Sequence, residues 1–160
     1  MPAAVIGTPR SFWNKFKFLV EIAGITYAGF QKSSELSKEL AKIEHWEGGR
    51  LTPFKSPGRM TVADITLERG ASTDLELYNW FEQTANASAG LGVGLVDPLY
   101  KREFDIVQLE RDDSIVQRFH CEGAWCTKFV AGEWDNTSDE KVMTSVTLAI
   151  DDFTPVFRGA

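Results

Sequence analysis

The sequence predicts a mainly β protein, a β-sandwich or partial barrel with one flanking α-helix. Three observations support this fold class. Several segments alternate apolar and polar residues with a period of two, which is typical of half-buried strands. Turn-forming residues separate these segments. One segment has clear helical periodicity and its own N-terminal capping signal.

The strands follow from the alternation. In residues 16–23, Phe18, Val20 and Ile22 share one face, and Lys17 and Glu21 lie on the other. Asp112-Asp113-Ser114 predicts a hairpin turn between two further strands, and GAWCT at 123–127 predicts a connection. We therefore expect strands at 16–23, 27–31, 61–69, 103–111 and 115–122, and a short extended piece at 129–130.

The last strand, residues 141–150, has no charged face beyond Lys141. Such a strand is covered on both sides, by its own core or by another chain. Supplying the cover from the next subunit, head to tail, would remove an exposed sheet edge.

The helix is expected at 74–87. Thr73 and Glu76 form a capping box, and Leu77, Trp80 and Phe81 follow at helical spacing. The glycines in 90–94 lack the spacing of a dinucleotide site and are interpreted as a linker.

Two neighbouring segments are harder to assign. Residues 33–47 place Leu36, Leu40 and Ile43 at helical spacing, so the local pattern favours a helix over a poorly amphipathic strand. Residues 48–58 contain Gly, Pro and Ser and predict a long loop. Loops of this length in compact domains are usually functional or mobile.

Composition narrows the function classes. The 160 residues suit one domain, 1–160, and 43% hydrophobic with 25% charged content is typical of soluble globular proteins. No apolar run is long enough for a membrane helix, and we expect no membrane partner. The net charge of −6 argues against binding nucleic acid through phosphate contacts, but not against a surface past which nucleic acid slides.

No grouping of residues predicts catalysis, a cofactor or a metal site. Asp112 and Asp113 are better explained as a solvated turn. His120 and Cys121 are strand neighbours, so they point to opposite faces and cannot form a nucleophile–base pair. Cys121 and Cys126 are interpreted as reduced, partly buried thiols rather than as a disulfide between chains. We expect no enzyme.

Five segments, in order, resemble the tail tube proteins of contractile-tailed bacteriophages, a family shared with the inner-tube proteins of phage-like contractile injection systems. They are FQKSSELSKELAKIEHWEGG (30–49), KSPG (55–58), ITLERG (65–70), DLELYNW (74–80) and Ala124-Trp125 with Lys128.

The resemblance implies a structural subunit that forms hexameric rings sharing a continuous inner β-barrel. The rings would stack into a tube for genome passage. It implies an extended segment at 39–46, against the local helical pattern. It also implies sheath, baseplate and tail terminator partners, with DNA passing through the lumen without specific binding. The tube would belong to the virion and assemble in the host bacterial cytoplasm.

Within that framework, residues 1–12 are expected to be an N-terminal arm, 48–58 an assembly loop and 151–160 a C-terminal tail. Trp46 and Phe54 are expected to anchor the loop on another subunit. The full set of expected subunit or ring interface residues is Trp46, Leu51, Phe54, Lys55, Val142, Thr144 and Val146.

Two alternatives stay open. The chain resembles an injection-system inner tube as closely as a phage tube. From another class, a small monomeric β-barrel with an apolar ligand would use the five Trp and eleven Phe as pocket walls.

Overall fold

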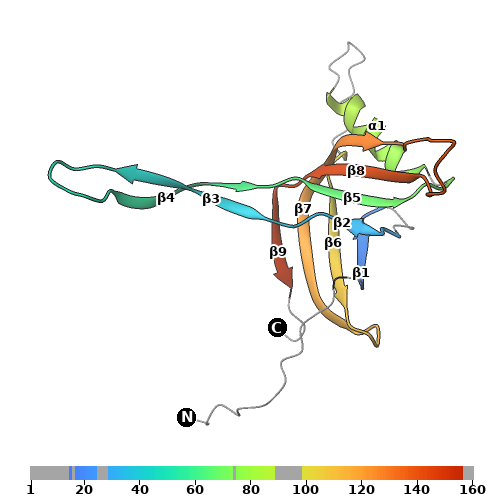
Figure 1. Cartoon of the computed structure of the whole chain (residues 1–160), viewed down its shortest axis with the longest axis horizontal. Coiled ribbons are helices and arrows are strands. Elements are labelled where there is room, and N and C mark those ends of the chain that lie inside the picture. Colours follow the sequence, from blue (N-terminus) through green and yellow to red (C-terminus); the bar gives the residue numbers. More distant parts are fainter. Residues whose placement is uncertain (1–14, 16, 25–28, 74, 89–98, 157–160) are drawn as a thin grey trace, which may run out of the picture.

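The computed structural model describes residues 15, 17–24, 29–73, 75–88 and 99–156. These residues form antiparallel strands and one helix, α1 (Glu76–Ser88), as Figure 1 shows. The larger sheet joins, in spatial order, β1 (Phe18–Ile22), β6 (Arg102–Leu109), β7 (Ile115–Val130), β8 (Met143–Ala149), β5 (Ile65–Gly70) and β2 (Lys32–Ser33); β9 (Asp152–Val156) also pairs with β7. A separate two-stranded sheet contains β3 (Lys38–His45) and β4 (Phe54–Val62).

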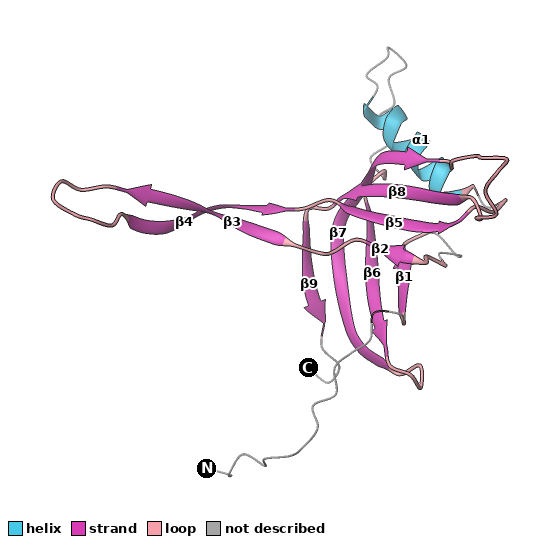
Figure 2. Ribbon diagram, viewed as in Figure 1, coloured by secondary structure: helices cyan, strands magenta, loops and turns pink. Residues whose placement is uncertain are grey.

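The 16-residue strand β7 divides the larger sheet into two layers. Residues 115–124 of β7 pair with β6, and residues 125–130 pair with β8. Gly123 lies between the two parts with a φ of 65°, a conformation that glycine adopts without steric cost. The bend turns β1, β6 and β9 across the direction of β5 and β8 (Figure 2). The described strands form an open sheet whose ends, β1 and β2, do not pair with each other.

The core fills the space between the layers and under the helix. Helix α1 contributes Leu77 and Trp80, both almost fully buried, and it contacts β7. The indole Nε1 of Trp80 donates a hydrogen bond to the carbonyl oxygen of Tyr100 at 2.8 Å. The strands supply the other fully buried large side chains, namely Phe104, Ile65, Leu67, Leu148, Val107, Val146, Cys121 and Cys126.

Several predictions are confirmed. The first strand is β1, with Val20 and Ile22 buried and Glu21 exposed. The helix lies within two residues of its expected bounds. The β6–β7 turn is held by Asp112, whose carboxylate accepts hydrogen bonds from the backbone NH and hydroxyl of Ser114. The predicted linker at 90–94 and the arm at 1–12 lie outside the described residues.

Other predictions are wrong. Residues 123–127 are not a connection, because strand β7 continues through its bend. Residues 38–45 are strand β3, so the resemblance was a better guide than the helical pattern. The 48–58 loop ends at Pro53, and from Phe54 the chain is strand β4. Residues 152–156 of the expected tail form strand β9. The second strand is β2, and residues 29–31 before it are not strand.

The final strand is covered by its own chain, which is one of the two alternatives that the sequence left open. Strand β8 lies between β7 and β5, so both of its edges are paired within the chain. One face of β8 is buried in the core, and the other is half-buried. The missing charge therefore reflects an interior position. Among the described strands of the larger sheet, β1, β9 and β2 each have one edge without a partner strand.

Candidate assembly surface

The β3–β4 hairpin projects far from the two layers of the body (Figure 1). Its strands pair antiparallel from Lys38 opposite Val62 to His45 opposite Phe54, with one register shift between Leu40 and Lys42. A Cβ at Gly58 would lie 3.1 Å from the carbonyl oxygen of Ala41, so glycine fits this close approach. Residues 46–53 connect the strands at the tip.

The base of the hairpin is fixed to the body. The ammonium of Lys38 forms an ion pair with Asp152 at 3.2 Å and donates to the carbonyl oxygen of Phe153 at 2.9 Å. The same ammonium lies 4.7 Å from the centre of the Phe153 ring. The backbone NH of Ala63 donates to the carbonyl oxygen of Ser37 at 3.0 Å. The hairpin is therefore positioned by β9 and by its own two ends.

The outer part of the hairpin exposes large apolar side chains. All eight residues of β3 are exposed, and Leu51 at the tip is 98% exposed. An isolated two-stranded hairpin is marginally stable in water at best. Contiguous exposed apolar surface marks interaction sites. The exposed apolar residues of the hairpin are Leu40, Ile43, Trp46, Leu51, Phe54 and Met60.

The tip has a defined local arrangement. The guanidinium of Arg50 lies 3.6 Å from the centre of the Phe54 ring, a cation–π contact. The backbone NH of Arg50 donates to the carbonyl oxygen of Glu47, and Gly49 has a φ of 87°. The tip therefore presents an aromatic ring and a cation side by side.

The structure divides the expected interface residues into two groups. Trp46, Leu51, Phe54 and Lys55 lie together at the outer end of the hairpin, and all four are exposed. The group of Val142, Thr144 and Val146 lies at and within β8, where Val146 is completely buried in the chain's own core and Thr144 nearly so.

Sequence reasoning missed three of the exposed apolar residues. Leu40 and Ile43 were assigned to the apolar face of a helix, and Met60 was not considered. The strand register identifies these residues. It pairs Leu40 with Met60 and Ile43 with Ser56 on a hairpin that packs against no core, so the three apolar side chains are exposed.

A network of charged groups crosses β1, β6 and β7. Asp105 lies 2.6 Å from the Nδ1 of His120, and Arg118 donates to Asp105 at 2.7 Å and to Glu21 at 2.9 Å. The hydrogen bond to Asp105 raises the pKa of His120. Burial alone would raise the pKa of Asp105, but the hydrogen bonds from Arg118 and His120 outweigh it and lower that pKa. These contacts stabilise strand pairing across the sheet.

The two thiols lie in the core. Cys121 and Cys126 are free and buried, and burial raises the pKa of each to about 12. His120 faces the charged network, whereas its neighbour Cys121 faces the core, as expected for adjacent strand residues. Among the described residues, no three His, Cys, Asp or Glu side chains are grouped to hold a metal ion.

Residues 14–154 match the family of the T4-like virus tail tube protein gp19. The chain belongs to this family. It is therefore a structural tube subunit, and the expectation drawn from the five sequence segments is confirmed. No curated protein sequence matches this tail tube protein significantly. In the described part of this tail tube protein, no helix is long and apolar enough to cross a membrane.

Solved structures of similar fold cover nearly the whole tail tube chain. One is a chain of the extracellular contractile injection system PVC, from its sheath-tube complex in the extended state, with a TM-score of 0.75, 21% identity, and 91% of this chain and 92% of that chain covered. A second is from the cap of the anti-feeding prophage, with a TM-score of 0.79, 20% identity, and 99% and 100% covered. A third is from the six-fold symmetrised baseplate of the anti-feeding prophage, with a TM-score of 0.72, 19% identity, and 95% and 98% covered.

Proposed function

We propose that copies of this chain form hexameric rings that stack into the inner tube of a contractile particle, around a channel through which cargo passes. The observation that carries this proposal is the β3–β4 hairpin. It exposes six large apolar side chains and projects away from its own core. Such a hairpin is stable when a neighbouring chain covers it.

Ring formation also uses the open sheet. A head-to-tail contact between identical chains closes into a ring or continues as a filament, and a tube combines both. The strand edges at β1, β9 and β2 allow a neighbouring copy to extend the sheet, which yields the continuous inner barrel. The six-fold symmetry named for the anti-feeding prophage baseplate supports the hexameric state.

The partners follow from the particles in which similar folds occur. The PVC structure is named as a sheath-tube complex, and the anti-feeding prophage structures are named as a baseplate and a tube-terminating cap. We infer that this tube contacts a sheath along its length, a baseplate at one end and a terminator at the other. Assembly takes place in the host bacterial cytoplasm.

The cargo of the channel is either a phage genome or the load of an injection system. The family match favours a phage tail, whereas the similar solved structures favour an extracellular injection system. A net charge of −6 suits passage of DNA without binding, because like charges repel phosphate.

A concentration series tests the assembly directly. Purified protein is followed by light scattering and negative-stain microscopy, beside Leu51→Ser and the control Leu99→Ser, which changes an exposed leucine outside the hairpin. We expect rings or cylinders from the wild type and the control, and fewer from Leu51→Ser. A wild type that stays monomeric at every concentration favours the ligand-binding barrel and contradicts the proposal.

A further inference from the structure

The outer hairpin carries an excess of positive charge as well as apolar surface. Its residues 42–59 contain four cations, Lys42, Arg50, Lys55 and Arg59, against two carboxylates, Glu44 and Glu47. Lys42 pairs with Glu44 at 3.4 Å, and Arg50 lies on the Phe54 ring. Lys55 and Arg59 form no ion pair with any described residue. The outer hairpin therefore combines exposed aromatic side chains with cations, of which Lys55 at the tip and Arg59 farther along β4 have no ion-pair partner among the described residues.

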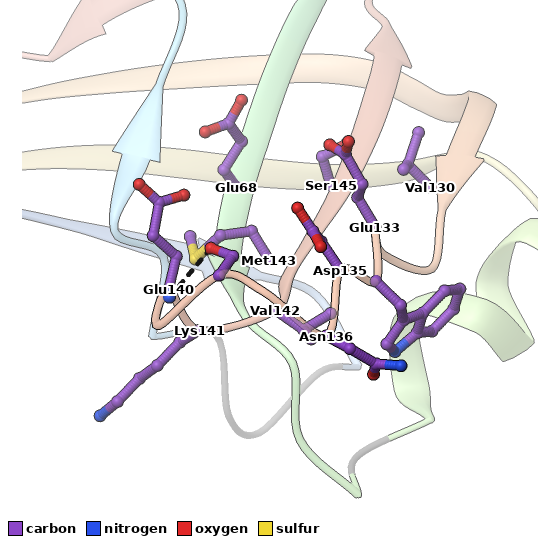
Figure 3. A pocket seen from close by; sticks show the side chains of 12 residues that line it. Glu68, Val130, Glu133, Asp135, Asn136, Glu140, Lys141, Val142, Met143 and Ser145 are labelled. Carbon is purple, nitrogen blue, oxygen red and sulfur yellow. Dashed lines mark hydrogen bonds between the residues drawn. The ribbon is translucent and has the colours of Figure 1, made fainter.

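A hollow of about 480 Å³ has the opposite character. It lies between the β7–β8 loop, residues 131–142, and the ends of β5, β7 and β8. Figure 3 shows the carboxylates of Glu68, Glu133, Asp135 and Glu140 around this hollow, while the side chain of Lys141 points away from them. None of the four carboxylates forms an ion pair with a described residue.

The hollow also has an apolar part. Trp134, which is 74% exposed, lines it together with Val142 and Met143. An aromatic side chain beside uncompensated carboxylates matches a partner that presents both an aromatic ring and cations. The hairpin tip is such a partner, with Phe54 and Arg50 in contact and Lys55 adjacent.

The hairpin tip cannot reach the hollow of its own chain. The hairpin tip and the β7–β8 loop lie at opposite ends of the long axis of the molecule (Figure 1). A projection at one end and a complementary hollow at the other define a head-to-tail contact between two copies. A second copy of this chain is the occupant whose charge and shape match the hollow.

We propose that the hairpin tip of one copy docks into the acidic hollow of a neighbouring copy. Arg50 and Lys55 face Glu133 and Asp135, and Phe54 packs against Trp134. This inference rests on the proposed tube assembly, and it identifies the surface that receives the hairpin. The contact has two consequences, since it brings two cations to the carboxylates of the hollow, three of which are exposed in the single chain, and it covers the apolar tip in the same step.

Reciprocal charge reversal tests the docking. One variant carries Arg50→Glu and Lys55→Glu, a second carries Glu133→Lys and Asp135→Lys, and a third combines all four changes. We expect each double variant to need about tenfold more protein for tube formation, which corresponds to roughly 1.4 kcal/mol. The combined variant should recover most of the loss, because the charge pairs are restored in reverse.

The matched control is Glu35→Lys with Glu110→Lys, two exposed carboxylates outside both surfaces. It makes the same change in net charge as the hollow variant and should form tubes like the wild type. Far-UV circular dichroism of each variant at low concentration establishes that the body is folded.

The outcomes separate this inference from the proposed function. Wild-type tubes with double variants that assemble normally, or with a combined variant that recovers nothing, overturn the hairpin-to-hollow contact and leave the tube intact. A wild type that forms no tubes overturns both. Loss in both double variants, recovery in the combined variant and a normal control establish the contact.

Discussion

Replacing the two aromatic anchors of the hairpin separates assembly from folding. Trp46 is 60% exposed and Phe54 is 46% exposed in the single chain. Aromatic side chains bury roughly 150–250 Å² each, so the two leave about 200 Å² for a neighbour to cover. At about 25 cal/mol per Å² this surface is worth about 5 kcal/mol if fully buried.

Incomplete cover and side-chain ordering reduce that gain. We therefore expect Trp46→Ser with Phe54→Ala to weaken association by at least about 2 kcal/mol, or about thirtyfold in the association constant. The free energy of unfolding of the monomer should change by less than about 0.5 kcal/mol, because the side chains lie outside the core.

Two assays measure these effects on the same protein. Sedimentation with negative-stain microscopy gives the concentration at which tubes form, and urea unfolding at low concentration gives monomer stability. Leu99→Ser serves again as the control for loss of an exposed apolar side chain. Tubes forming at the wild-type concentration would refute the reasoning, as would a large loss of monomer stability.

Three further predictions concern the body of the protein. Val146→Ala should lower the free energy of unfolding by about 2 kcal/mol in urea titrations, because Val146 is a fully buried core residue. If the stability of the monomer is unchanged and tube formation is impaired, Val146 is an interface residue instead. The raised pKa of His120 means that its stabilising pair with Asp105 is complete below its ordinary value of 6.5 and is lost as pH rises through the higher folded value. In thermal unfolding, the stability of the wild type should therefore fall as the pH rises from 6.5 through the raised pKa of His120, whereas the stability of His120→Gln should stay constant over that range. The same pH dependence in both proteins would contradict this. Cys121 and Cys126, with pKa values raised to about 12 by burial, should react with a thiol reagent near pH 8 only after unfolding, and rapid labelling of the native chain would be inconsistent with their positions.

The elements that pack against the core could be predicted from the sequence. The alternation of Val20 and Ile22 and the helical spacing of Leu77 and Trp80 both reflect a single buried face. The turn at Asp112 could also be predicted from local sequence, because the Asp112 carboxylate accepts a hydrogen bond from the backbone NH of Ser114.

The hairpin could not be predicted from local pattern. Strand β3 is exposed on both faces, so selection for a buried face imposed no alternation on it. Its strand conformation depends on pairing with β4, which runs through Pro57 and Gly58, residues that ordinarily indicate a loop. The resemblance to the tail tube family indicated a strand here, because a family's sequence pattern reflects how segments pair with one another. The periodicity of one segment carries no such information.

The bend in β7 and the hollow depend on contacts that are distant in sequence. Gly123 predicted a break, but the strand continues because β6 and β9 hold its first part and β8 holds its second. The hollow combines Glu68 of β5 with carboxylates of the β7–β8 loop. No local pattern links these residues, since antiparallel pairing alone brings them together.

Cryo-electron microscopy of assembled tubes tests the central claim most directly, because it locates the β3–β4 hairpin relative to neighbouring copies. The account predicts hexameric rings in which every hairpin tip is covered by another chain. Tubes in which the hairpins extend freely into solvent, or particles that contain one copy only, would contradict it.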